Sequence, residues 1–324
     1  MNGVATSREA ILSGALAALI LLVETRFSGF ASPSNLAGVF NDTSILIILA
    51  LGQMLVILTR CIDLSQASNL ALTGMVTAML NAAMPDLPVV LLIAVAVGLG
   101  LLLGAINGLL VWKLEIPPIV VTLGTLTIYR GAVFLVSGGE WINSHEMSVA
   151  YKAFPRATFL SLPAMSWICI AVIAAFAVGV TRTAAGRAFY AAGGNPGAAV
   201  YAGIDVGRAR FRAFVIAGGL AGLCGYLWVA RYAVAYTDVA GGFELDVVAA
   251  CVVGGIAIMG GSGTVAGAVL GALFLGTIKN ALPVAGVSPF WQMAISGAAI
   301  IVAVAVNTRR APGRVILRSA EARA

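Results

Sequence analysis

Ten long apolar stretches dominate this 324-residue chain and leave little polar sequence from which to build a water-soluble surface. Hydrophobic residues make up 60% of the chain and charged residues 10%, whereas an ordinary soluble domain has about 25% charged residues. A protein of this size folded in water cannot hide so much apolar side chain. The composition therefore excludes a cytosolic enzyme, a nucleic-acid-binding domain and a disordered chain. It predicts one transmembrane domain over residues 1–324 whose surroundings are the lipid bilayer, with no nucleic acid as partner.

A helix needs roughly 20 apolar residues to cross the hydrocarbon core of a bilayer. We expect an all-α polytopic membrane protein with about ten spans, some of them short or broken. The expected spans cover residues 9–24, 44–59, 64–82, 88–112, 118–137, 163–181, 212–230, 246–260, 264–281 and 290–306. Two of them, 44–59 and 246–260, are short and adjoin a polar or glycine-rich break. Lipid cannot satisfy loose backbone groups, so such breaks are expected where protein surrounds them.

The basic residues indicate how these spans are oriented. Residues 182–212 and the tail 307–324 each carry five arginines against one acidic residue. Four predicted spans separate these segments, and six separate the first from the N-terminus, so all three lie on one side. Thirteen Lys and Arg residues then fall on this side and four on the other, with Arg130 and Lys279 inside spans. Because positively charged loops stay in the cytoplasm, we expect both termini and the 182–212 loop to be cytoplasmic.

Several kinds of chemistry have no support in the sequence. The four cysteines form no CxxC pair and the only histidine is His145, so neither a disulfide framework nor a metal site is expected. No Gly-Lys pair occurs, and a phosphate-binding loop of the GxxxxGK[ST] type is therefore missing. We expect no catalytic residue, no enzymatic activity and no cofactor, with any ATP bound by a separate partner subunit.

Glycines recur every four residues in three places, which predicts stripes where another helix backbone can approach closely. The stripes are Gly100, Gly104 and Gly108; Gly263, Gly267 and Gly271; and the pair Gly218 and Gly222. Ordinary helix packing is the simplest interpretation of each stripe, and a dimer contact or a pore lining is the alternative.

Asp63 and Ser65 follow the second span at the start of the third. Either side chain can cap the amides at a helix start, and Asp63 can pair with Arg60 three residues earlier. A direct role in transport is the alternative.

Arg130 lies in the middle of a span, where a charge must pair or face a polar cavity. Glu140 or a residue of another span could be its partner. Lys279 lies near a span end and can extend outward to the interface. Asn107, Gln53 and Gln292 are predicted to form hydrogen bonds between helices.

The 182–212 loop contains a short helix. Asn195 suits a helix cap, Pro196 the first helical position and Gly203 the stop, which predicts a helix over 196–202. It is too short to be stable alone. Because it carries no Lys or Arg, we favour a protein partner over the lipid surface. The residues expected to couple this loop to the partner are Arg187, Asn195, Pro196, Ala198, Ala199, Tyr201 and Gly203.

Three segments together resemble the membrane subunit of ribose-type monosaccharide importers of the ATP-binding-cassette class. They are Ile62-Asp63-Leu64-Ser65, the loop residues 186–204, and the glycine-rich residues 244–263. Arg60 and Cys61 stand where the family has two glycines, and Ala67 stands where it has another. Within the family, residues 116–141 look most like the autoinducer-2 and rhamnose branch.

This resemblance implies an assembly in the inner membrane of a bacterium. Its parts are two permease subunits (identical or a related pair), a separate ATPase subunit that supplies two ATPase domains, and a periplasmic sugar-binding protein. The 182–212 loop would carry the coupling helix that docks on the ATPase. Residues expected on the translocation path or at a structural break are Asp63, Ser65, Arg130, Glu244 and Asp246. The alternative function is a secondary transporter or channel for a small polar solute that works alone.

Overall fold

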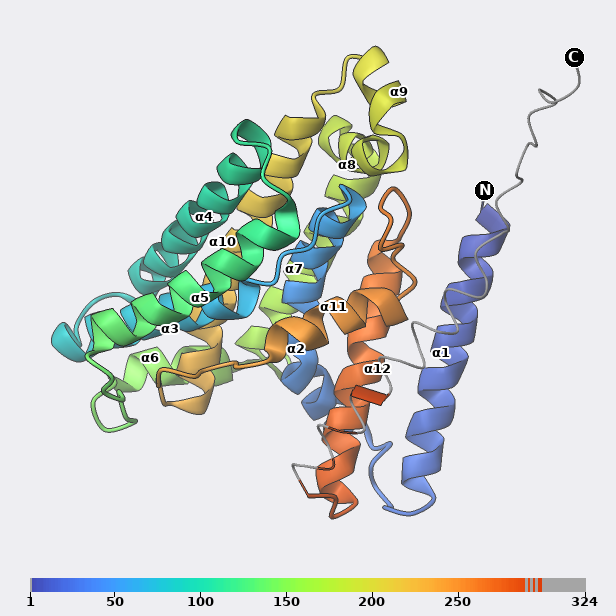
Figure 1. The fold of residues 1–324 in the computed structure, drawn as a ribbon. Coiled ribbons are helices and arrows are strands. Elements are labelled where there is room, and N and C mark those ends of the chain that lie inside the picture. Colours follow the sequence, from blue (N-terminus) through green and yellow to red (C-terminus); the bar gives the residue numbers. More distant parts are fainter. Residues whose placement is uncertain (1, 289–290, 292–293, 295–296, 299–324) are drawn as a thin grey trace, which may run out of the picture.

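The computed structural model describes residues 2–288, 291, 294 and 297–298, and helices make up most of this part (Figure 1). The longer helices are α1 (Asn2–Glu24), α2 (Pro33–Leu58), α3 (Gln66–Ala83), α4 (Val89–Lys113), α5 (Pro118–Ser137), α7 (Ala164–Arg182), α10 (Val206–Tyr232) and α12 (Val265–Val284). The shorter ones are α6 (Val149–Ala153), the 3-10 turn η1 (Phe154–Arg156), α8 (Ala184–Gly194), α9 (Pro196–Tyr201) and α11 (Phe243–Val253). The expected all-α fold has one small exception. Two strands of two residues each, β1 (Thr158–Phe159) and β2 (Leu162–Pro163), pair in antiparallel orientation.

Within the described residues, six helices are long and apolar enough to cross a membrane, namely α2, α4, α5, α7, α10 and α12. The prediction of a polytopic helical membrane protein is therefore confirmed, while the count of ten spans stays a prediction. The tenth predicted span, 290–306, lies for the most part outside the described residues, and the basic tail 307–324 lies wholly outside them.

Helix α2 is the centre of the bundle, because every residue from Thr43 to Leu58 is buried. The prediction of a short span over 44–59 is wrong. The helix begins at Pro33. Ser32 is its cap residue, and the Ser32 hydroxyl accepts a hydrogen bond from the Asn35 amide. The polar residues at its start suggested a loop, but they bind side chains of other helices: Asp42 pairs with Arg231 of α10, and the Asn41 amide oxygen lies 3.0 Å from the Ser166 hydroxyl of α7. By contrast, α11 is short and ends at Val253, as predicted for the other broken span.

The glycine stripes are confirmed as helix-packing sites except at Gly263, which lies in the loop before α12 and therefore does not share a helix face with Gly267 and Gly271. A Cβ atom added at Gly100 of α4 would lie 2.8 Å from the Gly222 backbone of α10, and one at Gly104 would lie 3.0 Å from Gly218. The third stripe works the same way, because a Cβ at Gly271 of α12 would lie 2.6 Å from the Gly254 nitrogen just after α11. Backbones in such close contact leave these helix pairs little freedom to slide.

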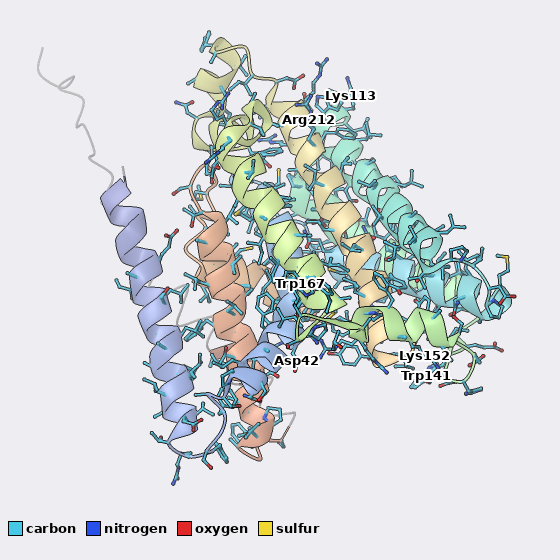
Figure 2. The ribbon with its side chains drawn as sticks, turned by 180° about the vertical axis from the view of Figure 1, so that it is seen from behind. Asp42, Lys113, Trp141, Lys152, Trp167 and Arg212 are labelled. Carbon is cyan, nitrogen blue, oxygen red and sulfur yellow. The ribbon has the colours of Figure 1, made fainter. Side chains whose placement is uncertain are left out.

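The polar segments divide between two ends of the bundle. Helices α8 and α9 lie at one end, where α4 ends and α10 begins (Figure 1). Lys113 and Arg212 lie at this same end, which we call the basic end, whereas Trp141 and Lys152 lie at the opposite end (Figure 2). Loop 138–163 and loop 182–212 are thus separated by the length of α7.

The close approach of α4 and α10 gives a direct test. We expect Gly100→Val to reduce the yield of folded, monodisperse protein sharply, since overpacking costs about 1–3 kcal/mol even where neighbours can shift and here the neighbour is backbone. The matched control is Gly98→Val on the same helix, where an added Cβ meets nothing within 4 Å. Size-exclusion profiles and thermal midpoints in detergent measure both variants. Equal behaviour of the two variants would contradict the glycine contact.

Candidate functional site

The break between α2 and α3 places a carboxylate deep inside the protein. Asp63 is 3% exposed and Ser65 is 1% exposed. One carboxylate oxygen of Asp63 accepts hydrogen bonds from the Ser65 amide at 2.9 Å and from the Ser65 hydroxyl at 2.7 Å. Ser65 stands at the cap position of α3, but its side chain makes no capping bond. The predicted pairing of Asp63 with Arg60 does not occur either, because the Arg60 guanidinium binds the end of α8.

Three neighbouring helices complete the site around Ser65. The Asn107 amide of α4 donates to the Ser65 hydroxyl at 2.7 Å, and the Tyr129 hydroxyl of α5 donates to the Asn107 oxygen at 3.4 Å. The amides of Gln53 on α2 and Gln66 on α3 meet at 2.8 Å. The predicted roles of Asn107 and Gln53 in bonding helices together are confirmed, and Gln292 lies outside the described residues. We call Gln53, Asp63, Ser65, Gln66, Asn107 and Tyr129 the buried polar cluster.

The interior beside the buried polar cluster retains hydrogen-bonding capacity. Among the described residues, the side-chain oxygen of Asn69, on the first turn of α3, has no hydrogen-bond partner, and Asn69 is 3% exposed. An unpaired buried acceptor costs about 1–3 kcal/mol, so this oxygen is suited to accept a hydrogen bond from water or from a hydroxyl-rich solute.

Arg130 of α5 is held by the loop that precedes α11. Its side chain is 20% exposed, and one terminal nitrogen donates to the Val239 carbonyl at 2.7 Å and lies 3.8 Å from the Asp238 carboxylate. The expectation that the Arg130 charge is paired is confirmed. Its partners are Asp238 and two backbone carbonyls, and not Glu140. Arg130 belongs to the opposite half of α5 from the end that meets the α2–α3 break.

Glu244 and Asp246 lie on the first turn of α11, away from the buried polar cluster. Asp246 forms an ion pair with Lys279 of α12, whose ammonium also lies 5.5 Å from the centre of the Phe243 ring. The prediction that Lys279 extends outward is therefore wrong, because a carboxylate inside the bundle is available to it. The predicted path residues consequently divide between two places: Asp63 and Ser65 lie in the α2–α3 break, whereas Arg130 meets the loop before α11, whose first turn carries Glu244 and Asp246.

At the basic end, the predicted short helix is present as α9. The Asn195 side chain accepts from the Ala198 amide at 3.1 Å, Pro196 is the first helical residue, and Gly203 has a left-handed φ of 77° that ends the turn. Helix α8 was not expected from the sequence; it begins at Ala184, and the hydroxyl of its cap residue Thr183 accepts a hydrogen bond from the Gly186 amide at 3.0 Å. Thr183 followed by an alanine-rich stretch was the available signal.

The two faces of α9 differ. Val200 is 62% exposed and Tyr201 is 96% exposed, and Ala198 is exposed beside them. Ala199 is 4% exposed, so the expectation that it enters a partner's groove is wrong, because it packs on its own chain. Arg187 is exposed on α8 and is available to a partner, as expected.

A hydrogen bond on α8 and a cavity beside α9 mark the surroundings of the two helices. The Tyr190 hydroxyl of α8 donates to the Gly263 carbonyl at 2.8 Å, and burial raises the pKa of Tyr190. A cavity of about 660 Å³ lies between the α4–α5 connection and the start of α10; its lining includes Trp112, Glu115, Pro117, Val200, Ile204 and Arg210.

Comparisons with known protein sequences show the relatives of the chain. The sequence model of the family described as "Branched-chain amino acid transport system / permease component" matches residues 35–304. The chain is similar to the autoinducer 2 import system permease protein LsrC of Enterobacter sp. (strain 638), with 37% identity over 95% of this chain and 89% of the relative. It is 36% identical to LsrC of Salmonella typhi over 91% and 84%, and 36% identical to LsrC of Escherichia coli O157:H7 over 92% and 86%. No solved structure matches the chain.

Arg130 supplies the second prediction. We expect Arg130→Leu to lower folded yield or transport, because the carbonyls of Thr237 and Val239 lose their charged donor; hydrogen bonds to charged groups contribute about 1.5–3 kcal/mol. Arg130→Lys should be intermediate, and the exposed Arg26 gives the control Arg26→Leu. Thermal midpoints measure the series. Arg130→Leu as stable and as active as the parent would show that the loop does not depend on this contact.

Proposed function

The chain belongs to the family of transport-system permease components, and we propose that it imports autoinducer 2 or a similar sugar-like solute as the membrane subunit of an ATP-binding-cassette importer. The relatives confirm the resemblance to ribose-type importer permeases and their autoinducer-2 branch. They are named as permease components and not as enzymes. The protein is therefore a multi-pass protein of the bacterial inner membrane, and an ATPase subunit and a periplasmic binding protein are its general partners.

One observation carries the proposal beyond family membership: the exposed face of α9 at the basic end. A helix of six residues cannot be stable alone, and this one is capped at both ends and presents Val200 and Tyr201 outward. Such a helix needs a protein surface to cover it. The alternative of a stand-alone transporter gives no reason for a small, uncharged and capped helix outside the membrane.

The mechanism follows from the positions of the two sites. ATP-driven closure of the partner displaces α9, and the bundle converts this displacement into alternating access. The buried polar cluster offers amide and hydroxyl groups, which suit a solute rich in hydroxyls and need not form a tight site when a binding protein selects the solute. The finer features that we propose are ten spans, a pair of permease subunits, and the coupling roles of Arg187, Asn195, Pro196, Ala198, Tyr201 and Gly203.

The direct test is uptake into proteoliposomes that contain the permease with ATP inside and the binding protein outside. A panel of labelled autoinducer 2, ribose, rhamnose and leucine is compared with and without the ATPase subunit. We expect uptake of autoinducer 2 only when the ATPase is present. Equal uptake without it would establish a stand-alone transporter, and uptake of leucine alone would replace the sugar-like substrate by an amino acid.

The faces of α9 give a third prediction. We expect Ala198→Trp to reduce both ATPase association and uptake at least tenfold, because a bulky side chain cannot enter a shallow groove, while the spans stay folded. Ala199→Trp should instead damage the fold of the loop itself, since Ala199 is buried. Pulldown of the ATPase and uptake are measured in the same samples, with Val149→Trp at the opposite end as control. Normal association and uptake in Ala198→Trp would refute the assignment.

The orientation gives a fourth prediction. Helix α1 begins toward the end where α9 lies, and loop 138–163 lies at the other end (Figures 1 and 2). This arrangement supports a cytoplasmic N-terminus. A topology reporter fused after Arg314 should behave as cytoplasmic and one inserted near Ser148 as periplasmic, because thirteen of the Lys and Arg residues fall on the cytoplasmic side. A periplasmic signal after Arg314 would contradict the ten-span topology.

A further inference from the structure

Arg60 connects two segments that are more than a hundred residues apart in the chain. It lies in the break between α2 and α3, and its guanidinium reaches the last two residues of α8. Nε donates to the Gly193 carbonyl at 2.5 Å, and a terminal nitrogen donates to the Gly194 carbonyl at 2.9 Å. The next residue, Asn195, is the cap of α9. Arg60 therefore holds the elbow between α8 and α9.

The backbones around Arg60 are interlocked. The Gly261 amide donates to the Leu58 carbonyl at 3.0 Å. A Cβ atom at Gly193 would overlap that same carbonyl, and one at Gly260 would lie 2.5 Å from Cγ of Arg60. Three segments thus meet without intervening side chains: the end of α2, the end of α8 and the loop between α11 and α12. The Arg60 side chain is fixed on both sides at this junction.

Arg60 holds a backbone conformation that favours glycine. Its φ of 63° is left-handed, a conformation that glycine adopts without strain and that other residues rarely adopt. The carbonyls at a helix C-terminus lack partners within the helix and attract cations. A guanidinium offers several donors in a fixed plane, so it can satisfy two such carbonyls at once.

We propose that Arg60 is a positioning residue that ties the α8–α9 elbow to the α2–α3 break, so that movement of α9 reaches the buried polar cluster. Asp63 is three residues from Arg60, and its neighbour Ser65 binds α4 through Asn107. This inference rests on the proposed function, in which a partner ATPase moves α9. Without Arg60, α9 would still dock, but the elbow would lose its two side-chain hydrogen bonds to the break and less of its movement would reach the cluster.

The experiment uses the complete importer in proteoliposomes and measures solute transported per ATP hydrolysed. Arg60→Gly removes the guanidinium and relieves the backbone at the same time, so it tests the contact without adding strain. Arg60→Lys keeps a cation, and Lys113→Gln removes an exposed cation from the same end as the matched control. We expect the ratio to fall at least fivefold in Arg60→Gly with ATPase association unchanged, to recover partly in Arg60→Lys, and to stay at the parent value in Lys113→Gln.

Either of two results in this assay overturns the inference. One is a parent-like ratio in Arg60→Gly. The other is loss of the ATPase from the Arg60→Gly complex, which would give Arg60 a role in assembly and not in transmission.

A second measurement on the permease alone does not depend on any transport activity. Spin labels at Tyr201→Cys on α9 and Met259→Cys beside the junction report how firmly the elbow is held; both positions are more than 75% exposed, and the four native cysteines are buried. We expect Arg60→Gly to broaden the distance distribution at least twofold and Lys113→Gln to leave it unchanged. An unchanged distribution in Arg60→Gly overturns the inference. Should the parent importer show no ATP-dependent uptake, the proposed function fails, and this measurement alone decides whether Arg60 holds the elbow.

Discussion

The fold depends on one constraint, which is that backbone polar groups inside a bilayer must find partners within the protein. Helix α2 satisfies it through its own backbone hydrogen bonds, and every residue from Thr43 to Leu58 is also enclosed by other helices. The chain can therefore leave the helical conformation directly after α2 without exposing peptide groups to lipid. Residues 59–65 use this freedom, and the Thr122 hydroxyl of α5 donates to the Ile62 carbonyl at 3.2 Å within the break.

The α2–α3 break and the exposed helix α9 at the basic end are the two features that a transport subunit needs. The buried polar cluster supplies polar groups at depth, and α9 supplies a surface for a partner that provides energy. The packing between them is rigid where glycines bring α4 and α10 together, and it is held by directed hydrogen bonds where Arg60 meets the end of α8. Movement is thus expected where loops meet, as at the contact between Arg60 and the end of α8, and not within the long helices.

Sequence reasoning succeeded where the signal is local. The cap, first residue and stop of α9 lie within nine residues, and glycine stripes recur at a fixed spacing on one helix. It failed where partners are distant in sequence: polar Asn41 and Asp42 looked like loop until α7 and α10 supplied partners, and Lys279 looked free to extend outward until α11 supplied Asp246. The inward face of Ala199 likewise follows only from the packing of α9 on its own chain.

The central claim is that protein, and not lipid, surrounds α2 from Thr43 to its end at Leu58. Labelling with a photoactivated carbene probe dissolved in the bilayer tests this claim most directly, with the labelled peptides mapped by mass spectrometry. The account predicts no label from residue 44 to 58 and label on the outward residues of α4 and α5, such as Leu102 and Ile128, which are 57% and 64% exposed. Label on α2 equal to that on α4 would contradict it.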